Sequence, residues 1–91
     1  MRISGGIAKG IALKITRTPS LRPATEANRE RLFSSLGDSI KGARVLDLFA
    51  GSGAYGLEAL SRGSDYAHFV EKNRKIFYDL ISNTEKVRKS A

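Results

Sequence analysis

The sequence predicts an α/β fold, the opening half of a doubly wound parallel sheet, because its second half alternates strand-like and helix-like segments. An apolar run at 44–49 leads into a glycine-rich loop and then into a helical segment at 57–62, which stops at Gly63. A second apolar run at 66–70 follows, and an amphipathic helix begins after Asn73 as its cap. This strand, helix, strand, helix order places both strands in one parallel sheet.

The first half of the chain predicts smaller elements. Segments 2–4 and 11–15 flank three glycines and predict a β-hairpin, and two prolines make 16–23 a connector. A helix is expected from Thr25, a suitable N-cap, to Leu36, with a glycine stop behind it. The apolar face predicted for this helix consists of Leu32, Phe33, Leu36 and, beyond it, Ile40.

Composition narrows the function classes. The 91 residues have room for one small domain, and a hydrophobic fraction of 41% with a mean hydropathy of −0.28 is typical of a soluble globular chain. With no cysteine and one histidine, disulfides and thiol catalysis are excluded and no metal site is expected. No apolar stretch has the length of a membrane span or a signal peptide, so we expect a cytoplasmic protein.

Positive charge is concentrated in the first half. The formal net charge is +7, and residues 1–44 hold nine Lys or Arg against three acids. The first 25 residues contain five bases and no acid, so no local charge neutralises their field. This end of the chain is expected to attract a polyphosphate surface such as RNA.

A glycine motif marks the expected ligand site. Gly51, Gly53 and Gly56 fit the pattern G-x-G-x-x-G between a predicted strand and a predicted helix, and Glu71 follows Gly51 by 20 residues at the end of the next strand. Glycines at these positions let a ligand lie against the backbone at the helix N-terminus. Glu71 is expected to accept hydrogen bonds from both hydroxyls of a ribose.

The identity of that ligand depends on Asp47, four residues before Gly51. A carboxylate at this position would repel the pyrophosphate of a dinucleotide, which argues against a nicotinamide-dependent oxidoreductase. S-adenosylmethionine carries a sulfonium and an ammonium group and no phosphate, so the same carboxylate favours it. The alternative interpretation is that Asp47 only orders the following loop through its own hydrogen bonds.

Several ordered motifs resemble one known family. Val45–Gly53, Gly56–Gly63 and Val70–Asn73 closely resemble the RsmD-like bacterial methyltransferases, which modify a guanine exocyclic amine in 16S ribosomal RNA. Arg2–Gly10 and Leu21–Phe33 are similar to that family's amino-terminal hairpin and its Arg-Pro-Thr segment. The resemblance extends from Arg2 to about Asn83 and implies a Rossmann-like class I methyltransferase fold.

The resemblance implies two domains, a basic hairpin with its connector at 1–24 facing RNA and a partial S-adenosylmethionine-binding α/β domain at 25–91. The partner it implies is ribosomal RNA or a small-subunit assembly particle, while the catalytic residues stay unassigned. The expected cofactor-binding residues are Asp47, Phe49, Ala50, Gly51, Ser52, Gly53, Glu71 and Thr25. The expected RNA-binding residues, chosen because no acids compensate them, are Arg2, Lys9, Lys14 and Arg22.

One expected segment is missing from the sequence. Methyltransferases of this kind carry an Asn/Asp-Pro-Pro-Tyr/Phe loop that holds the target amine, whereas the prolines here are Pro19 and Pro23. We therefore expect a truncated chain that is inactive alone, has an uncovered sheet face, and is stabilised by pairing with another chain. The alternative is a non-catalytic RNA-binding module of the same fold.

The remaining conspicuous residues have structural interpretations. Phe33, Phe69 and Phe77 are expected in the core, and His68 is expected to be a packed or edge histidine rather than a general base. The basic clusters at 72–75 and 86–89 are interpreted as solvated helix surface.

Overall fold

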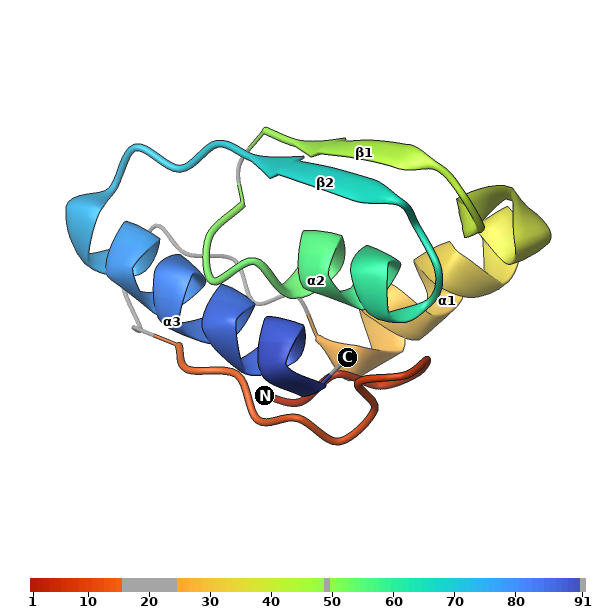
Figure 1. The fold of residues 1–91 in the computed structure, drawn as a ribbon, viewed down its shortest axis with the longest axis horizontal. Coiled ribbons are helices and arrows are strands. Elements are labelled where there is room, and N and C mark those ends of the chain that lie inside the picture. The colour runs from red at the N-terminus through yellow and green to blue at the C-terminus, as the bar shows by residue number, and fades with distance from the viewer. Residues whose placement is uncertain (16–24, 49, 91) are drawn as a thin grey trace.

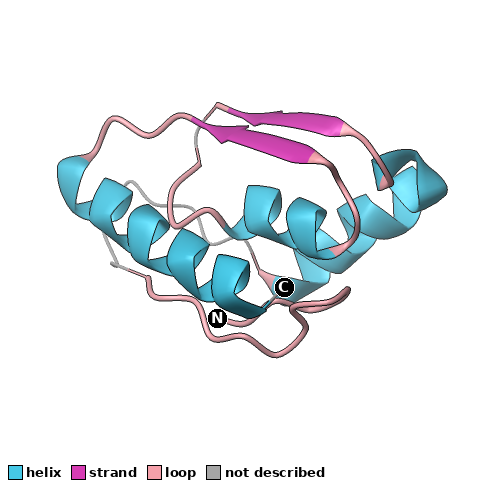
Figure 2. Cartoon of the chain, in the orientation of Figure 1, coloured by secondary structure: helices cyan, strands magenta, loops and turns pink. Residues whose placement is uncertain are grey.

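The computed structural model describes residues 1–15, 25–48 and 50–90, and it places a two-stranded sheet over a layer of helices (Figure 1). Strands β1 (Arg44–Asp47) and β2 (Tyr66–Phe69) are parallel, with Arg44 opposite Tyr66 and Asp47 opposite Phe69. The helices lie on one side of this sheet, as Figure 2 shows. They are α1 (Glu26–Leu36), the 3-10 helix η1 (Gly37–Ile40), α2 (Ala54–Ser61) and α3 (Arg74–Ser90). The predicted α/β order is confirmed.

The amino-terminal hairpin forms only in part. Within the described residues it has one antiparallel bridge, between Arg2 and Ala12, and no strand. The turn of this segment bonds to α2 instead, because the N–H of Ile7 donates to the carbonyl oxygen of Ser61 (2.9 Å) and the N–H of Ala8 donates to the Ser61 hydroxyl (2.9 Å). Backbone groups that would have extended the ladder are thereby satisfied by a helix.

Helix α1 begins and ends as predicted, but it buries a different face. The Thr25 hydroxyl accepts from the N–H of Asn28 at the N-terminus, and Gly37 follows the last turn with a positive φ of 52°. Of the expected apolar face, Phe33 and Ile40 are buried, whereas Leu32 and Leu36 are 43% and 39% exposed. The fully buried residue on α1 is Arg29, because a carboxylate on α2 receives it.

The core joins the amino-terminal segment to the helices. Its larger cluster contains Ile3, Ala8 and Leu13 of the amino-terminal segment together with Ala54, Leu57 and Val87 of α2 and α3. Phe69 of β2 packs against this cluster, whereas Phe77, expected in the core, is 41% exposed. Helix α2 lies so close to β2 that a Cβ at Gly56 would come within 2.2 Å of the Phe69 ring. The amino-terminal segment is thus part of the same packed unit as α2 and α3.

A buried carboxylate on α2 fixes this packing. Glu58 is fully buried and accepts from the N–H groups of Ser4 and Gly5, each at 2.9 Å. It also pairs with the Nε of Arg29 at 3.1 Å and with the Nε of Arg62 at 2.8 Å. Burial opposes ionisation, but the hydrogen bonds from Ser4 and Arg62 and the charge of Arg62 outweigh it, so the pKa of Glu58 is lowered.

The sheet face away from the helices is uncovered, as the sequence predicts for two strands. It presents Arg44 and Leu46 from β1 and Tyr66 and His68 from β2. The Arg44 guanidinium lies 5.2 Å from the Tyr66 ring centre, and the Tyr66 hydroxyl is 3.2 Å from Nδ1 of His68. Self-association through this face stays a prediction. Among the described residues, none of the helices has both the length and the apolar content to cross a bilayer.

Replacing the buried carboxylate tests this account of the fold. Glu58→Gln removes the carboxylate that pairs with the buried guanidinium of Arg29. We therefore expect the free energy of unfolding to fall by roughly 3 kcal/mol at about pH 7. Because the pKa of Glu58 lies below its ordinary value of 4.5 in the folded state, its stabilisation is present above that value and is lost as the pH falls through the folded-state pKa. Urea unfolding followed by circular dichroism should show this acid-dependent loss in the wild type and not in the variant.

The matched control is Glu85→Gln, which removes an exposed carboxylate paired with Arg88 on the surface. It should change the free energy of unfolding by less than about 0.5 kcal/mol. Equal effects of the two substitutions would show that Glu58 has no special structural role.

Candidate cofactor site

Two carboxylates meet at one edge of the sheet. Asp47 is the last residue of β1, and Glu71 follows the end of β2 by two residues. The strands are parallel and still in register here, since the N–H of Val70 donates to the carbonyl oxygen of Asp47 at 2.9 Å. The charge of Glu71 contributes to the raised pKa of Asp47, which shows that the two side chains share one electrostatic environment. The structure therefore brings together the two acids singled out in the sequence.

The glycine loop connects β1 to α2 beside these acids. Gly51 and Gly53 have φ values of 56° and 90°, which L residues with side chains rarely adopt. A Cβ at Gly53 would also come within 2.4 Å of the Leu80 side chain on α3. The two glycines thus allow the backbone to turn tightly into α2, while the close approach of a ligand to this backbone stays a prediction.

Glu71 ties this loop to the segment before α3 by two backbone hydrogen bonds. Its Oε1 accepts from the N–H of Gly51 and its Oε2 accepts from the N–H of Asn73, both at 2.8 Å. An ionised carboxylate has roughly four acceptor positions, so two remain after these bonds. Glu71 thus orders the loop and keeps acceptor capacity for hydroxyl groups of a ligand.

The side chain of Asp47 has a raised pKa and one oxygen atom without a hydrogen-bond partner among the described residues. Burial raises its pKa, the charge of Glu71 adds to the rise, and a hydrogen bond from the backbone N–H of Gly56 opposes it. Its Oδ2 is buried and has no hydrogen-bond partner among the described residues. The Gly56 bond is the loop-ordering role that the sequence left open, while the unpartnered oxygen can receive a donor.

The other expected cofactor residues lie in different parts of the chain. Ala50 and Ser52 are buried in the loop, and the N–H of Ala50 donates to the carbonyl oxygen of Val70 at 3.0 Å. Thr25 serves as the N-cap of α1. Phe49 lies outside the described residues, so its contact with a cofactor stays a prediction.

Asn83 is a site residue that the sequence reasoning missed. It is fully buried on α3, and its Nδ2 donates to the carbonyl oxygens of Ser52 and Lys14, each at 2.9 Å. Its Oδ1 accepts from the N–H of Lys14 at 2.7 Å. The sequence did contain a signal for its burial. Asn83 comes seven residues after Ile76 and four before Val87, so it shares their buried helix face, where a polar amide needs hydrogen-bond partners. One side chain therefore ties the glycine loop to the amino-terminal segment.

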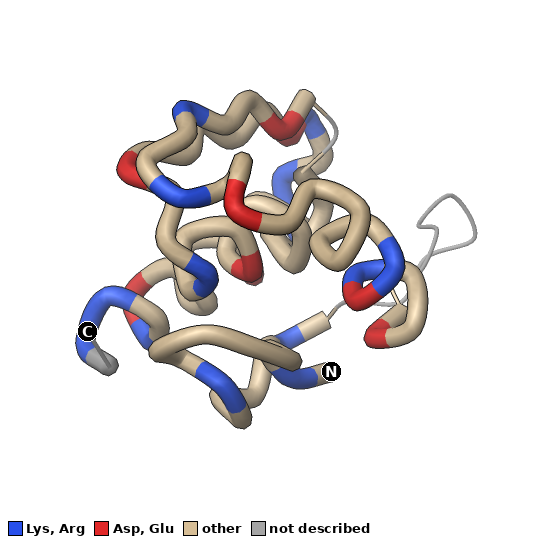
Figure 3. The backbone as a smooth tube through the Cα atoms, turned by 90° about the vertical axis from the view of Figure 1, so that its right-hand side faces the viewer, with Lys and Arg blue, Asp and Glu red and all other residues tan. Residues whose placement is uncertain are grey.

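Three of the four expected RNA-binding residues lie on the surface. Arg2, Lys9 and Lys14 are exposed, and Arg2 also donates to the carbonyl oxygen of Gly10 at 2.8 Å. Arg22 lies outside the described residues. Figure 3 shows basic positions near both ends of the chain. Arg29, by contrast, is turned inward to Glu58.

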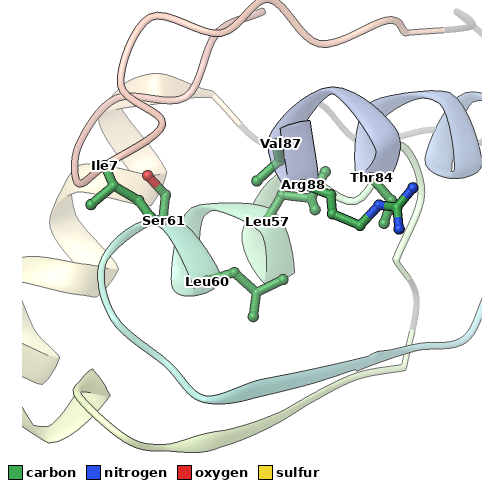
Figure 4. Close-up of a pocket in the computed structure, with 7 residues that line it drawn as sticks. All are labelled: Ile7, Leu57, Leu60, Ser61, Thr84, Val87 and Arg88. Atoms are coloured by element: carbon green, nitrogen blue, oxygen red, sulfur yellow. The ribbon is translucent and has the colours of Figure 1, made fainter. Parts of the chain in front are cut away.

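An apolar cavity of about 320 Å³ lies between the amino-terminal segment, α2 and α3, apart from the paired acids (Figure 4). Its lining consists of Ile7, Leu57, Leu60, Ser61, Thr84, Val87 and Arg88. A smaller groove of about 190 Å³ between α1, β1 and α2 does reach Asp47 and Tyr55. Of the expected site residues that the structure describes, only Asp47 lines this groove, and none of them lines the larger cavity.

The chain has the α/β architecture in which ligands are bound at the carboxyl ends of parallel strands, the edge at which Asp47 and Glu71 lie. The family described as "Conserved hypothetical protein 95" matches residues 1–91, and the chain belongs to it. The resemblance seen in the sequence is confirmed by its relatives, among them "Ribosomal RNA small subunit methyltransferase D" of Escherichia coli K12, which is 47% identical over 83 residues covering 91% of this chain and 42% of the relative. The protein of the same name from Buchnera aphidicola (strain APS) is 41% identical over 85 residues, covering 93% and 44%.

Solved structures agree with this assignment. The structure of yhhF from Escherichia coli matches with a TM-score of 0.86 and 41% identity, covering 97% of this chain and 47% of its own. A hypothetical protein from Thermus thermophilus matches with a TM-score of 0.82 and 42% identity, covering 97% and 50%. The chain therefore spans about half the length of the relatives it matches.

In the ligand-free chain, removing the charge of Asp47 and removing that of Glu71 should change the free energy of unfolding in opposite directions. Asp47→Asn removes a carboxylate whose pKa is raised in the folded state and keeps an acceptor for Gly56, so the free energy of unfolding should rise near pH 7. Because the folded-state pKa lies above 3.8, this gain should shrink as acid protonates Asp47 in the wild type. Glu71→Gln can replace only one of two backbone bonds and should lower stability by roughly 1 to 2 kcal/mol.

Urea unfolding of both variants beside the wild type measures the contrast. A loss of stability in Asp47→Asn as large as that in Glu71→Gln would contradict the assignment of an unsatisfied oxygen to Asp47.

Proposed function

We propose that this chain is the cofactor-binding part of an S-adenosylmethionine-dependent methyltransferase acting on a guanine exocyclic amine of small-subunit ribosomal RNA. The observation that carries the proposal is the pair Asp47 and Glu71 around the glycine loop, with one buried Asp47 oxygen left without a partner among the described residues. Relatives named ribosomal RNA small subunit methyltransferase D support the reaction and the substrate class.

The residues present fit this cofactor. S-adenosylmethionine would offer a cationic amino group to Oδ2 of Asp47 and two ribose hydroxyls to the remaining acceptor positions of Glu71. Gly51 and Gly53 lack the side chains that would hold a ligand away from the backbone. A dinucleotide would instead bring its pyrophosphate close to two carboxylates, which disfavours NAD.

The chemistry of the guanine amine determines which protein groups the reaction needs. When bound, S-adenosylmethionine supplies the electrophilic methyl group. The amine of guanine is a weak nucleophile because its lone pair is delocalised into the ring, so acceptors for its N–H bonds are needed beside the methyl donor. Asp47, Glu71 and the loop bind and orient the donor. We assign the acceptor role to an Asn/Asp-Pro-Pro-Tyr/Phe segment, a motif that this sequence does not contain.

The amino-terminal bases supply the docking surface in this proposal. Arg2, Lys9 and Lys14 are exposed, and phosphate contacts from such residues give affinity without sequence specificity. A guanine must also leave its stack before its amine can reach the methyl group. Docking of ribosomal RNA or of a small-subunit assembly particle by this surface positions that base.

Calorimetry with S-adenosylhomocysteine and NAD in parallel tests the cofactor. We expect heat of binding with S-adenosylhomocysteine alone, and Asp47→Asn should weaken that binding about tenfold or more because a charge-assisted hydrogen bond is lost. The matched control Asp65→Asn removes an exposed carboxylate of the turn before β2 and should leave the affinity unchanged. Heat with NAD alone would replace the methyltransferase proposal by the oxidoreductase alternative, and heat with neither compound would contradict the cofactor assignment.

A further inference from the structure

The last turns of α3 lie beside the amino-terminal segment, although the two are far apart in sequence (Figure 1). Nζ of Lys86 is 3.4 Å from the carbonyl oxygen of Ala12, and Asn83 bonds both backbone groups of Lys14. One turn further on, Val87 is buried in the same cluster as Ile3, Ala8 and Leu13. These contacts hold the two segments as one continuous surface.

The basic side chains of this surface are not neutralised. Lys9, Lys14, Lys86 and Lys89 are exposed, and within residues 1–15, 25–48 and 50–90 they form no ion pair. The acids of α3 are otherwise engaged, since Glu85 pairs with Arg88 at 2.9 Å and Asp79 is buried. Lys86 and Lys89 are three residues apart and therefore share one face of the helix. Four exposed lysines without an ion pair among the described residues therefore lie on two segments that contact each other.

We propose that Lys86 and Lys89 extend the RNA-binding surface of the amino-terminal segment onto α3 by contacting backbone phosphates. This inference rests on the proposed function for the class of partner and adds the helix to it. The sequence interpretation treated both basic clusters of α3 as solvated surface, but the structure separates them. Lys72 precedes α3, and Lys75 lies in its first turn, about 16 Å along the helix from Lys86. The second cluster instead contacts the amino-terminal segment.

Fluorescence anisotropy with a labelled RNA hairpin tests the surface in the 91-residue chain. The double variant Lys86→Gln with Lys89→Gln should weaken binding about tenfold at low salt and reduce the slope of log affinity against log salt by about 1.5, since each phosphate contact contributes about 0.7 to 0.9 to that slope. The control, Lys41→Gln with Arg44→Gln, also removes two positive charges from exposed positions, one just after η1 and one at the first residue of β1. Its affinity should stay within about twofold of the wild type, because only distant, screened charges change.

The outcomes separate this inference from the proposed function. Equal losses of RNA affinity in the two double variants would show that only the net charge of the chain matters. That result would overturn the inference about α3 and leave the proposed function untouched. A wild-type chain that does not bind the hairpin would overturn the surface together with the RNA part of the proposed function, while calorimetry with S-adenosylhomocysteine reports independently on the cofactor part. Binding to vesicles of anionic phospholipid that requires Lys86 and Lys89, with RNA binding unaffected, would assign the surface to a membrane and overturn the inference.

Discussion

The arrangement of this chain depends on one buried ion cluster, in which Glu58 receives two backbone N–H groups and two arginines. A carboxylate withdrawn from water is tolerated only when its acceptor positions are filled, and here the partners come from three separate parts of the chain. Ser4 and Gly5 bring the amino-terminal segment, Arg29 brings α1, and Arg62 follows α2 itself. Arg29 also donates to the carbonyl oxygen of Arg2. The ions thus help to set where a polar, basic segment lies on the α/β unit, together with apolar packing and the hydrogen bonds to Ser61 and Asn83.

The cluster also explains why the amino-terminal segment is not a regular hairpin. The N–H groups of Ser4, Gly5, Ile7 and Ala8 bond to side chains and backbone of α2. Between the arms there remain the bridge of Arg2 and Ala12 and a backbone bond from Gly10 to Ile3. Gly6 makes this approach possible, because a Cβ there would be 1.9 Å from the Ser61 carbonyl oxygen. Because the segment packs on a helix in this way, its exposed lysines are attached to a rigid backbone, which a free two-stranded hairpin in water lacks.

The sequence predicted the strand, loop and helix order well because that part of the fold is encoded locally. The run before Gly51, the glycines, and the acid after β2 each have a spacing with a direct physical meaning, and the structure places Asp47 and Glu71 at one sheet edge. Burial on α1 and α3 was predicted less well. Leu32, Leu36 and Phe77 have apolar side chains at helical spacing, yet they are exposed, because which side of a helix is covered depends on the tertiary partner. Polar residues that pair across distant segments, such as Glu58 and Asn83, leave no periodic signal of that pairing.

The amide of Asn83 touches two regions to which different ligands are assigned, the carbonyl oxygen of Ser52 in the loop and both backbone groups of Lys14. Such a bridge creates thermodynamic linkage. If closing the loop on a methyl donor restricts the backbone at Lys14, the entropy of ordering that backbone no longer opposes nucleic-acid docking, and docking strengthens donor affinity by the same factor. Each of the two molecules would then bind more tightly to a chain that already holds the other.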